Sequence, residues 1–299
     1  MRKIASATFS IYLVLVCSIA YCTGSNDSTL INKKRLNTVL IGTGVAYGSA
    51  LIVLNEAWYK EQGKGDFHFF NDNSQWNQVD KAGHFYSAYQ LSKIGKQLFL
   101  WTNMSEKKSA IWGSVMSQAI MIPIEIMDGN AVEYGFSWGD IAANLLGSGF
   151  FLSQELIWKD QKIKTKFSFH RTDYAKLRPE VLGDGFFEEL LKDYNGQTYW
   201  LSFDMYTLGN YNRKIPKWLN IAIGYGAEGM VYGREDENID NGYNSYRQYF
   251  VGIDFDLSHI QSRKKVVKTL LFVADMIKFP APTLEFNNRN GVNFHWLYF

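Results

Sequence analysis

Long apolar stretches separated by polar breaks fill the first half of the chain. They cover residues 36–58, 82–101, 110–127 and 138–158. Each is about 20 residues long, enough for a helix that crosses a bilayer or lies inside a core. Small residues recur in the first stretch, which favours close helix packing in lipid. We expect an apolar four-helix bundle, either membrane-associated or buried in a soluble domain.

The second half of the chain shows a period of two. Apolar residues take every other position in 199–205 and 249–257, and 219–225 and 292–299 repeat the pattern. Such alternation predicts strands with one covered, apolar face. A spanning barrel needs at least about eight strands, and fewer are visible here. We therefore expect a small antiparallel sheet that lies on the membrane or on the helices.

Together these patterns predict an α+β fold with two parts. The helical bundle is expected over residues 35–160, and the strand-rich C-terminal region over residues 161–299. Within the latter, residues 186–192 and 263–279 are expected to be helices, and 233–246 a long loop.

The beginning of the chain has the features of a secretory signal peptide. Two basic residues precede an uncharged apolar run over residues 5–20, and a small-x-small cleavage site ends at Ala20. We expect a signal peptide over residues 1–24 and a polar tether over residues 25–34, with an uncleaved anchor as the alternative.

Composition and charge narrow the location. Both cysteines, Cys17 and Cys22, lie in this leader, which excludes a disulfide framework and thiolate chemistry in the remainder. Cys22 is a candidate for lipidation, although Tyr21 is a poor residue for a lipobox. The net charge of +2 argues against nucleic acid, and the 16% of aromatic residues suits a lipid–water boundary. We expect the outer membrane or its periplasmic face, with the inner membrane as the alternative.

One set of polar residues lies at the ends of the apolar helices. If these helices are antiparallel neighbours, the set converges at one end of the bundle. Its members are Asp80, Lys81, His84, Glu125, Asp128, Ser137, Asp140 and Asn144.

Each member also has an ordinary structural interpretation. Ser137 and Asp140 fit a helix cap, and Asp80 fits a cap or a pair with Lys81. His84 fits a hydrogen-bonded core histidine. A buried carboxylate needs a partner, so Glu125 is expected to have one, with His84 or Lys81 as the natural choice.

The chemistry of this set stays open at this point. His84, Glu125 and Asp80 are the candidates for catalysis, with His84 as acid or base. A metal held by His84 with Asp80, Glu125 and Asp128 has little support from a single histidine, so no metal and no other cofactor is expected.

A motif through residues 65–155 resembles known families. An Asp-Lys-x-x-His-Phe string begins at Asp80, a glutamate follows in an apolar helix, and Ser-x-x-Asp-x-x-x-Asn-x-x-Gly runs from Ser137 to Gly147. This pattern resembles VanZ-like membrane proteins, and more closely the YfiM-like predicted periplasmic lipoproteins, a family of unknown function. The resemblance implies an envelope location and a helical bundle, and it implies no reaction.

Two hypotheses for function follow. The first is a non-enzymatic, membrane-associated envelope protein whose polar cluster is structural or binds a lipid head group or glycan. The second is a membrane-embedded hydrolase or transferase that acts on an envelope lipid or cell-wall precursor. Membrane lipid is the expected partner, and an envelope protein docked on the C-terminal strands is a further one.

Overall fold

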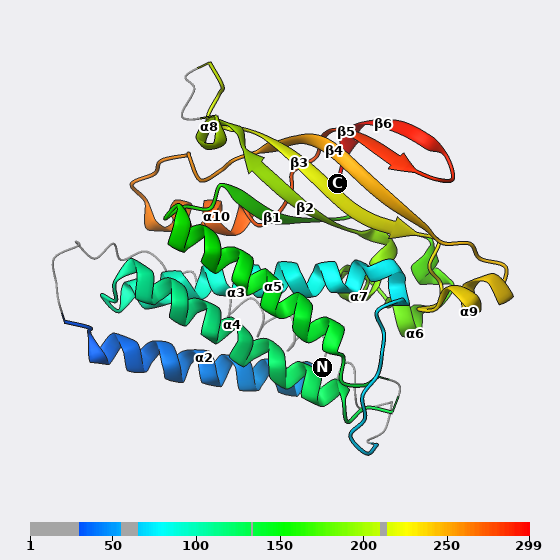
Figure 1. Ribbon diagram of the computed structural model, residues 1–299, viewed down its shortest axis with the longest axis horizontal. Helices are drawn as coiled ribbons and strands as arrows, with labels where there is room; N and C mark the ends of the chain where they lie inside the picture. Colours follow the sequence, from blue (N-terminus) through cyan, green and yellow to red (C-terminus); the bar gives the residue numbers. More distant parts are fainter. Residues whose placement is uncertain (1–29, 55–64, 133, 210–213) are drawn as a thin grey trace. The chain divides into compact units, whose positions relative to one another are not determined.

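A computed structural model describes residues 30–54, 65–132, 134–209 and 214–299 (Figure 1). The expected signal peptide, Cys22 and the first half of the tether lie outside the described residues. The chain forms two compact units. The helical unit comprises Met1–Asn71, Ser87–Lys159 and Ser262–Leu270, and the sheet unit comprises Asp72–Tyr86, Asp160–Gln261 and Leu271–Phe299.

Helices in the N-terminal half and an antiparallel sheet at the C-terminus confirm the predicted α+β class. The four apolar stretches correspond to α2 (Lys33–Leu54), α3 (Val79–Trp101), α4 (Glu106–Asp128) and α5 (Trp138–Ile157). Their arrangement as an apolar four-helix bundle stays a prediction.

Among the described residues, α4 is the one helix that is long and apolar enough to cross a membrane. Core helices of soluble proteins pass the same test, but those are mostly buried, and only 33% of the most apolar part of α4 is buried. The other three stretches do not meet this criterion within the described residues.

Apolar clusters and a close glycine contact hold the helical unit together. Val39, Leu98, Phe99 and Met104 form one cluster. Gly95 of α3 faces Gly113 of α4, where a Cβ on Gly113 would lie 2.5 Å from the backbone nitrogen of Lys96. The two helix backbones therefore touch at a point where no side chain fits.

The sheet unit contains six strands in sequence order, each antiparallel to its neighbours (Figure 1). They are β1 (Ile163–Phe169), β2 (Gln197–Asp204), β3 (Leu219–Glu228), β4 (Tyr246–Phe255), β5 (Ala281–Asn287) and β6 (Gly291–Tyr298).

Short helices occupy the connections. They are η2 (Gln75–Gln78), η3 (Tyr174–Lys176), η4 (Tyr194–Gly196), α6 (Pro179–Leu182), α7 (Phe186–Lys192), α8 (Met205–Leu208), α9 (Glu235–Asp240) and α10 (Lys265–Ala274).

The structure confirms α7 and corrects several other expected elements. The expected helix over 263–279 ends at Ala274, and the expected loop over 233–246 contains α9. Strands β1 and β5 were not expected, because their lysine, threonine and proline residues hide the alternation. β1 pairs with β2 along its whole length and β5 pairs with β4 over residues 283–287, so the sheet has more strands than the sequence alone indicates.

The apolar face of the sheet is exposed, and the opposite, mainly polar face is buried. In β4, Tyr249, Val251 and Ile253 are exposed, whereas Gln248 and Asp254 are buried. The apolar face continues across the sheet. One row of register partners on it consists of Leu201, Ile223, Val251, Leu284 and Phe294. The described part of the chain therefore does not cover this apolar face with protein, and the opposite face carries mainly polar and small residues. That the apolar face lies on a membrane stays a prediction.

Substituting Gly113 by alanine should destabilise the helical unit. The new methyl group meets the backbone of α3, and overpacking of this kind costs about 1–3 kcal/mol. The measurement is the thermal unfolding temperature of the purified protein. The matched control is Gly149→Ala in α5, where a Cβ meets nothing within 4 Å, so it should stabilise the helix by about 0.5–1 kcal/mol. A Gly113→Ala protein as stable as the control would contradict the close contact.

Candidate functional site

The start of α3 carries a compact set of charges in the sheet unit. Lys81 Nζ lies 3.0 Å from Asp80 Oδ2 and 2.8 Å from Asp72 Oδ2. Tyr194 donates a hydrogen bond to Asp80 Oδ1 at 2.9 Å, and His84 Nε2 lies 3.7 Å from the same oxygen. The expected pair of Asp80 with Lys81 is therefore present.

The pKa of Asp80 reflects this setting. Burial alone raises the pKa of this carboxyl group, but the charges of His84 and Lys81 and the hydrogen bonds from Lys81 and Tyr194 outweigh it. The net result is a pKa below the ordinary value, so Asp80 is ionised at neutral pH. An ionised acceptor holds its neighbours in place.

A left-handed turn immediately before α3 fixes the position of this set. Trp76, Asn77 and Gln78 have φ angles of 48°, 49° and 62°, a conformation that costs roughly 1–2 kcal/mol per residue. Contacts with the sheet hold it: the backbone N–H of Trp76 donates to Gly233, and Arg247 donates to Gln78 at 2.7 Å. The strain shows that the sheet unit imposes where α3 begins.

The remaining predicted residues lie in the helical unit. Glu125 and Asn144 are fully buried, and the Asn144 amide lies 3.5 Å from Glu125 Oε1. Ser137 is the N-cap of α5 and accepts a hydrogen bond from the Asp140 N–H at 3.1 Å. This confirms the cap, which by itself accounts for Ser137. Asp128 ends α4.

The predicted residues thus fall into two groups, one in each unit. Asp80, Lys81 and His84 form the first, and Glu125 with Asn144 and Ser137 with Asp140 belong to the second. Convergence of the two groups on one site stays a prediction.

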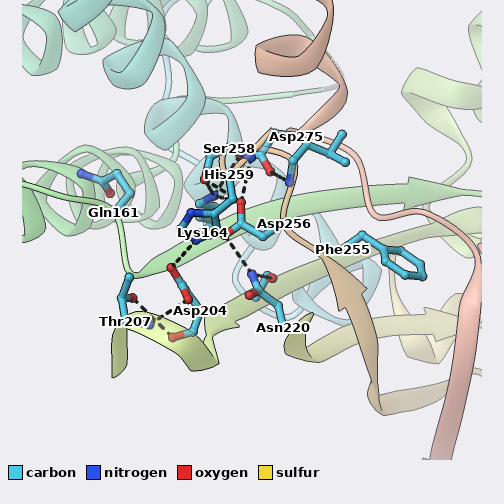
Figure 2. Close-up of polar contacts among 12 residues, drawn as sticks. Gln161, Lys164, Asp204, Thr207, Asn220, Phe255, Asp256, Ser258, His259 and Asp275 are labelled. Atoms are coloured by element: carbon cyan, nitrogen blue, oxygen red, sulfur yellow. Dashed lines mark hydrogen bonds and ion pairs between the residues drawn. The ribbon is translucent and has the colours of Figure 1, made fainter. Parts of the chain in front are cut away.

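A second polar cluster lies inside the sheet unit, and the sequence did not indicate it as a site (Figure 2). Lys164 Nζ contacts Asp256 Oδ1 at 2.6 Å and Asp275 Oδ2 at 3.3 Å. Lys166 Nζ contacts Asp254 Oδ2 at 2.7 Å and Asp275 Oδ1 at 3.6 Å. Asp275 therefore bridges the two lysines. All five residues are buried.

The one sequence feature that could have revealed this cluster is the alternation of polar and apolar residues within the strands. Asp254 and Asp256 take the positions between the apolar residues of 249–257, so they share one face. In an ordinary half-covered strand that face is solvated. Only the tertiary structure shows it closed by β1 and by the turn after α10.

Lys278 is a buried cation that this network only partly compensates. Its side chain is 1% exposed and lies 4.5 Å above the ring of Trp200. Burial lowers the pKa of Lys278, the charge of Asp254 opposes this shift, and the charge of Lys166 adds to it, so that the net pKa falls from 10.5 to about 8. The charged form is therefore disfavoured in the folded protein.

Replacing Lys278 by methionine should stabilise the protein near neutral pH. The folded pKa lies below the unfolded one, so the unfolded chain binds more protons between pH 8 and 10.5, and the stability of the wild type rises with pH over that window. The variant loses this rise and gains at most on the order of 3 kcal/mol at pH 7. Unfolding temperatures of the wild type and of Lys278→Met, measured from pH 6 to 10, test this prediction. Lys264→Met, at an exposed lysine, is the control. If the stability of Lys278→Met rises with pH as that of the wild type does, Lys278 is not the source of this rise.

Comparison with known proteins gave one family match, which covers the helical motif. Residues 66–154 match the model of a family described as "Predicted periplasmic lipoprotein (DUF2279)". The match covers all the predicted site residues but under a third of the chain, and the sheet from β1 onward lies outside it. Searches of curated proteins and of solved structures gave no match. The match confirms the predicted resemblance to periplasmic lipoproteins, whereas the YfiM-like and VanZ-like motifs stay predictions. Residues 66–154 are similar to a predicted periplasmic lipoprotein of the cell envelope, a family without an assigned reaction.

Proposed function

We propose that this chain is a non-enzymatic, membrane-associated protein of the cell envelope whose apolar exterior contacts lipid hydrocarbon. The main support is the distribution of side chains: many large apolar side chains are exposed, while many charged and amide side chains are buried.

The sheet unit gives the fuller support. Ile221 and Ile223 of β3 and Tyr249 and Val251 of β4 are exposed, and Trp296 of β6 is 78% exposed. Between them, the buried positions of β3 and β4 are polar, glycine or alanine, apart from Phe250. Lipid-facing strands have this pattern of apolar residues outside and polar residues inside.

The helical unit shows the same reversal independently. On α4, Trp112 and Val115 are exposed whereas Ser114 and Ser117 are buried. On α5, the exposed residues include Leu145 and Leu146, next to the buried Asn144, Gly147 and Ser148. Helices in lipid pack through small and polar residues because lipid tails offer no reason to bury leucine.

The polar clusters then have a structural role. Removing polar groups from water is tolerated when each finds a partner. Gln118 donates to Ser148 Oγ at 2.8 Å, and Lys96 pairs with Glu155 at 2.5 Å. Asp80 is met by Tyr194, Lys81 and His84. We infer that these contacts support the fold, and that a lipid head group or glycan is the ligand class that the charges at the start of α3 would attract.

A hydrolase or transferase with His84 as acid or base is the second candidate. The observation that favours it is the neighbouring carboxylate of Asp80. The separation of 3.7 Å exceeds a hydrogen bond, so the structural role is better supported.

Membrane fractionation tests the proposal. The expressed protein should stay with the membrane after a carbonate wash, because the apolar exterior holds it there. Separation of inner from outer membrane then gives the location. Recovery of the protein in the soluble fraction would overturn the proposal, and a stoichiometric partner recovered with that soluble protein would identify a protein as the occupant of the apolar face.

A charge placed on the exposed apolar face of the sheet tests whether this face contacts lipid. Val251→Glu should reduce the membrane-bound fraction, since a charged side chain on a lipid-facing strand is destabilising, although a glutamate costs less than the about 2–4 kcal/mol of an arginine or lysine at the bilayer midplane. The matched control is Asn288→Glu, at an exposed turn between β5 and β6. Equal membrane recovery of the two variants would show that this face does not contact lipid.

A further inference from the structure

Two carboxylates and a histidine come together where β2 ends and the segment after β4 begins (Figure 2). His259 Nε2 lies 3.3 Å from Asp204 Oδ2 and 3.9 Å from Asp256 Oδ2. One ligand atom from each of the three residues lies within 4.8 Å of the others. Asp256 and His259 are three residues apart, whereas Asp204 comes from a distant part of the sequence.

Each carboxylate is held by one oxygen and turns the other toward the histidine. Asp204 Oδ1 caps α8 by accepting from the N–H groups of Tyr206 and Thr207, both at 3.0 Å. Asp256 Oδ1 accepts from Lys164 at 2.6 Å and from Ser258. The Oδ2 atoms therefore face the imidazole in fixed positions.

A buried amide oxygen supplies an independent indication of a ligand. Asn220 is completely buried, and its Oδ1 has no hydrogen-bond partner among the described residues. Its Nδ2 lies 3.5 Å from Asp256 Oδ2, so the amide group borders the cluster. An unsatisfied buried oxygen is destabilising and requires an explanation. A cation at the cluster explains it, because the amide oxygen is then a ligand.

The geometry and the ligand types select a class of ion. Ligands about 2.1 Å from a tetrahedral ion lie about 3.4 Å apart, close to the shorter of the two distances at His259. One imidazole with carboxylate and amide oxygens suits a divalent transition metal rather than Mg²⁺ or Ca²⁺, which take oxygen alone. The side chain of His259 is 26% exposed and those of Asp204 and Asp256 are 5% and 0% exposed, so an ion has access from the histidine side.

We propose that Asp204, Asp256 and His259 bind a divalent transition-metal ion, with Asn220 Oδ1 as a further ligand. Such an ion ties the end of β2 to the segment after β4 and balances the carboxylate charge at this corner of the sheet unit.

Metal binding to the full chain in detergent tests the proposal. After treatment with EDTA, the protein is titrated with Zn²⁺ and separately with Mn²⁺ by calorimetry. One equivalent is expected to bind to the wild type and to raise its unfolding temperature. His259→Ala should weaken binding by at least about tenfold and abolish the rise.

Two further variants keep the result interpretable. Asp204→Asn retains the Oδ1 atom that caps α8 and loses only the charge, so it should fold and bind weakly. His68→Ala, at a histidine of the helical unit, should bind as the wild type does. The proposal is overturned if the wild type binds neither ion, or if His259→Ala binds as tightly as His68→Ala. If His259→Ala does not fold, His259→Gln replaces it under the same criteria.

Discussion

Burying Lys164 and Lys166 inside the sheet unit is possible only because three aspartates meet them there. An unpaired ammonium group in such a place would be deprotonated or would keep the unit open to water. Asp275 serves both lysines, and Asp254 and Asp256 serve one each. This pairing joins β1, the end of β4 and the turn after α10, so the interior of the sheet unit depends on it.

The burial of these charge pairs also explains where the apolar side chains of the sheet unit lie. A polar interior leaves the apolar side chains of each strand on the outside, and the sheet presents them in continuous rows. The interior also needs room for the few large rings it contains. Gly224 provides it, because the ring of Trp200 lies against its Cα, where a Cβ would be 2.6 Å from the ring. Trp200, Phe250 and Tyr298 form one apolar cluster of the interior, and Val79, Ala227 and Met230 form another.

The helical unit also has polar and small residues inside and apolar residues outside, although its contacts differ from those of the sheet unit. Small residues let the backbones touch, serines satisfy backbone carbonyl groups, and Glu125 and Asn144 are buried beside each other. Two units with different secondary structure share an apolar exterior. The proposed contact with lipid accounts for this agreement in both units. The match of residues 66–154 to a periplasmic lipoprotein family is consistent with an envelope location.

The sequence by itself determined the local features: the four long helices, the short helix at 186–192, most of the strands, the α+β class and the residues of the helical motif. Each of these depends on periodicity, length or neighbouring residues, which are written along the chain. The sequence could not determine which face of a strand is buried, because alternation looks the same whether water or lipid lies outside. Nor could it pair Lys166 with Asp254 or bring His259 to Asp204, since those contacts join residues that only the register of the sheet makes neighbours. Tertiary structure decided them because burial and charge pairing are properties of the folded chain.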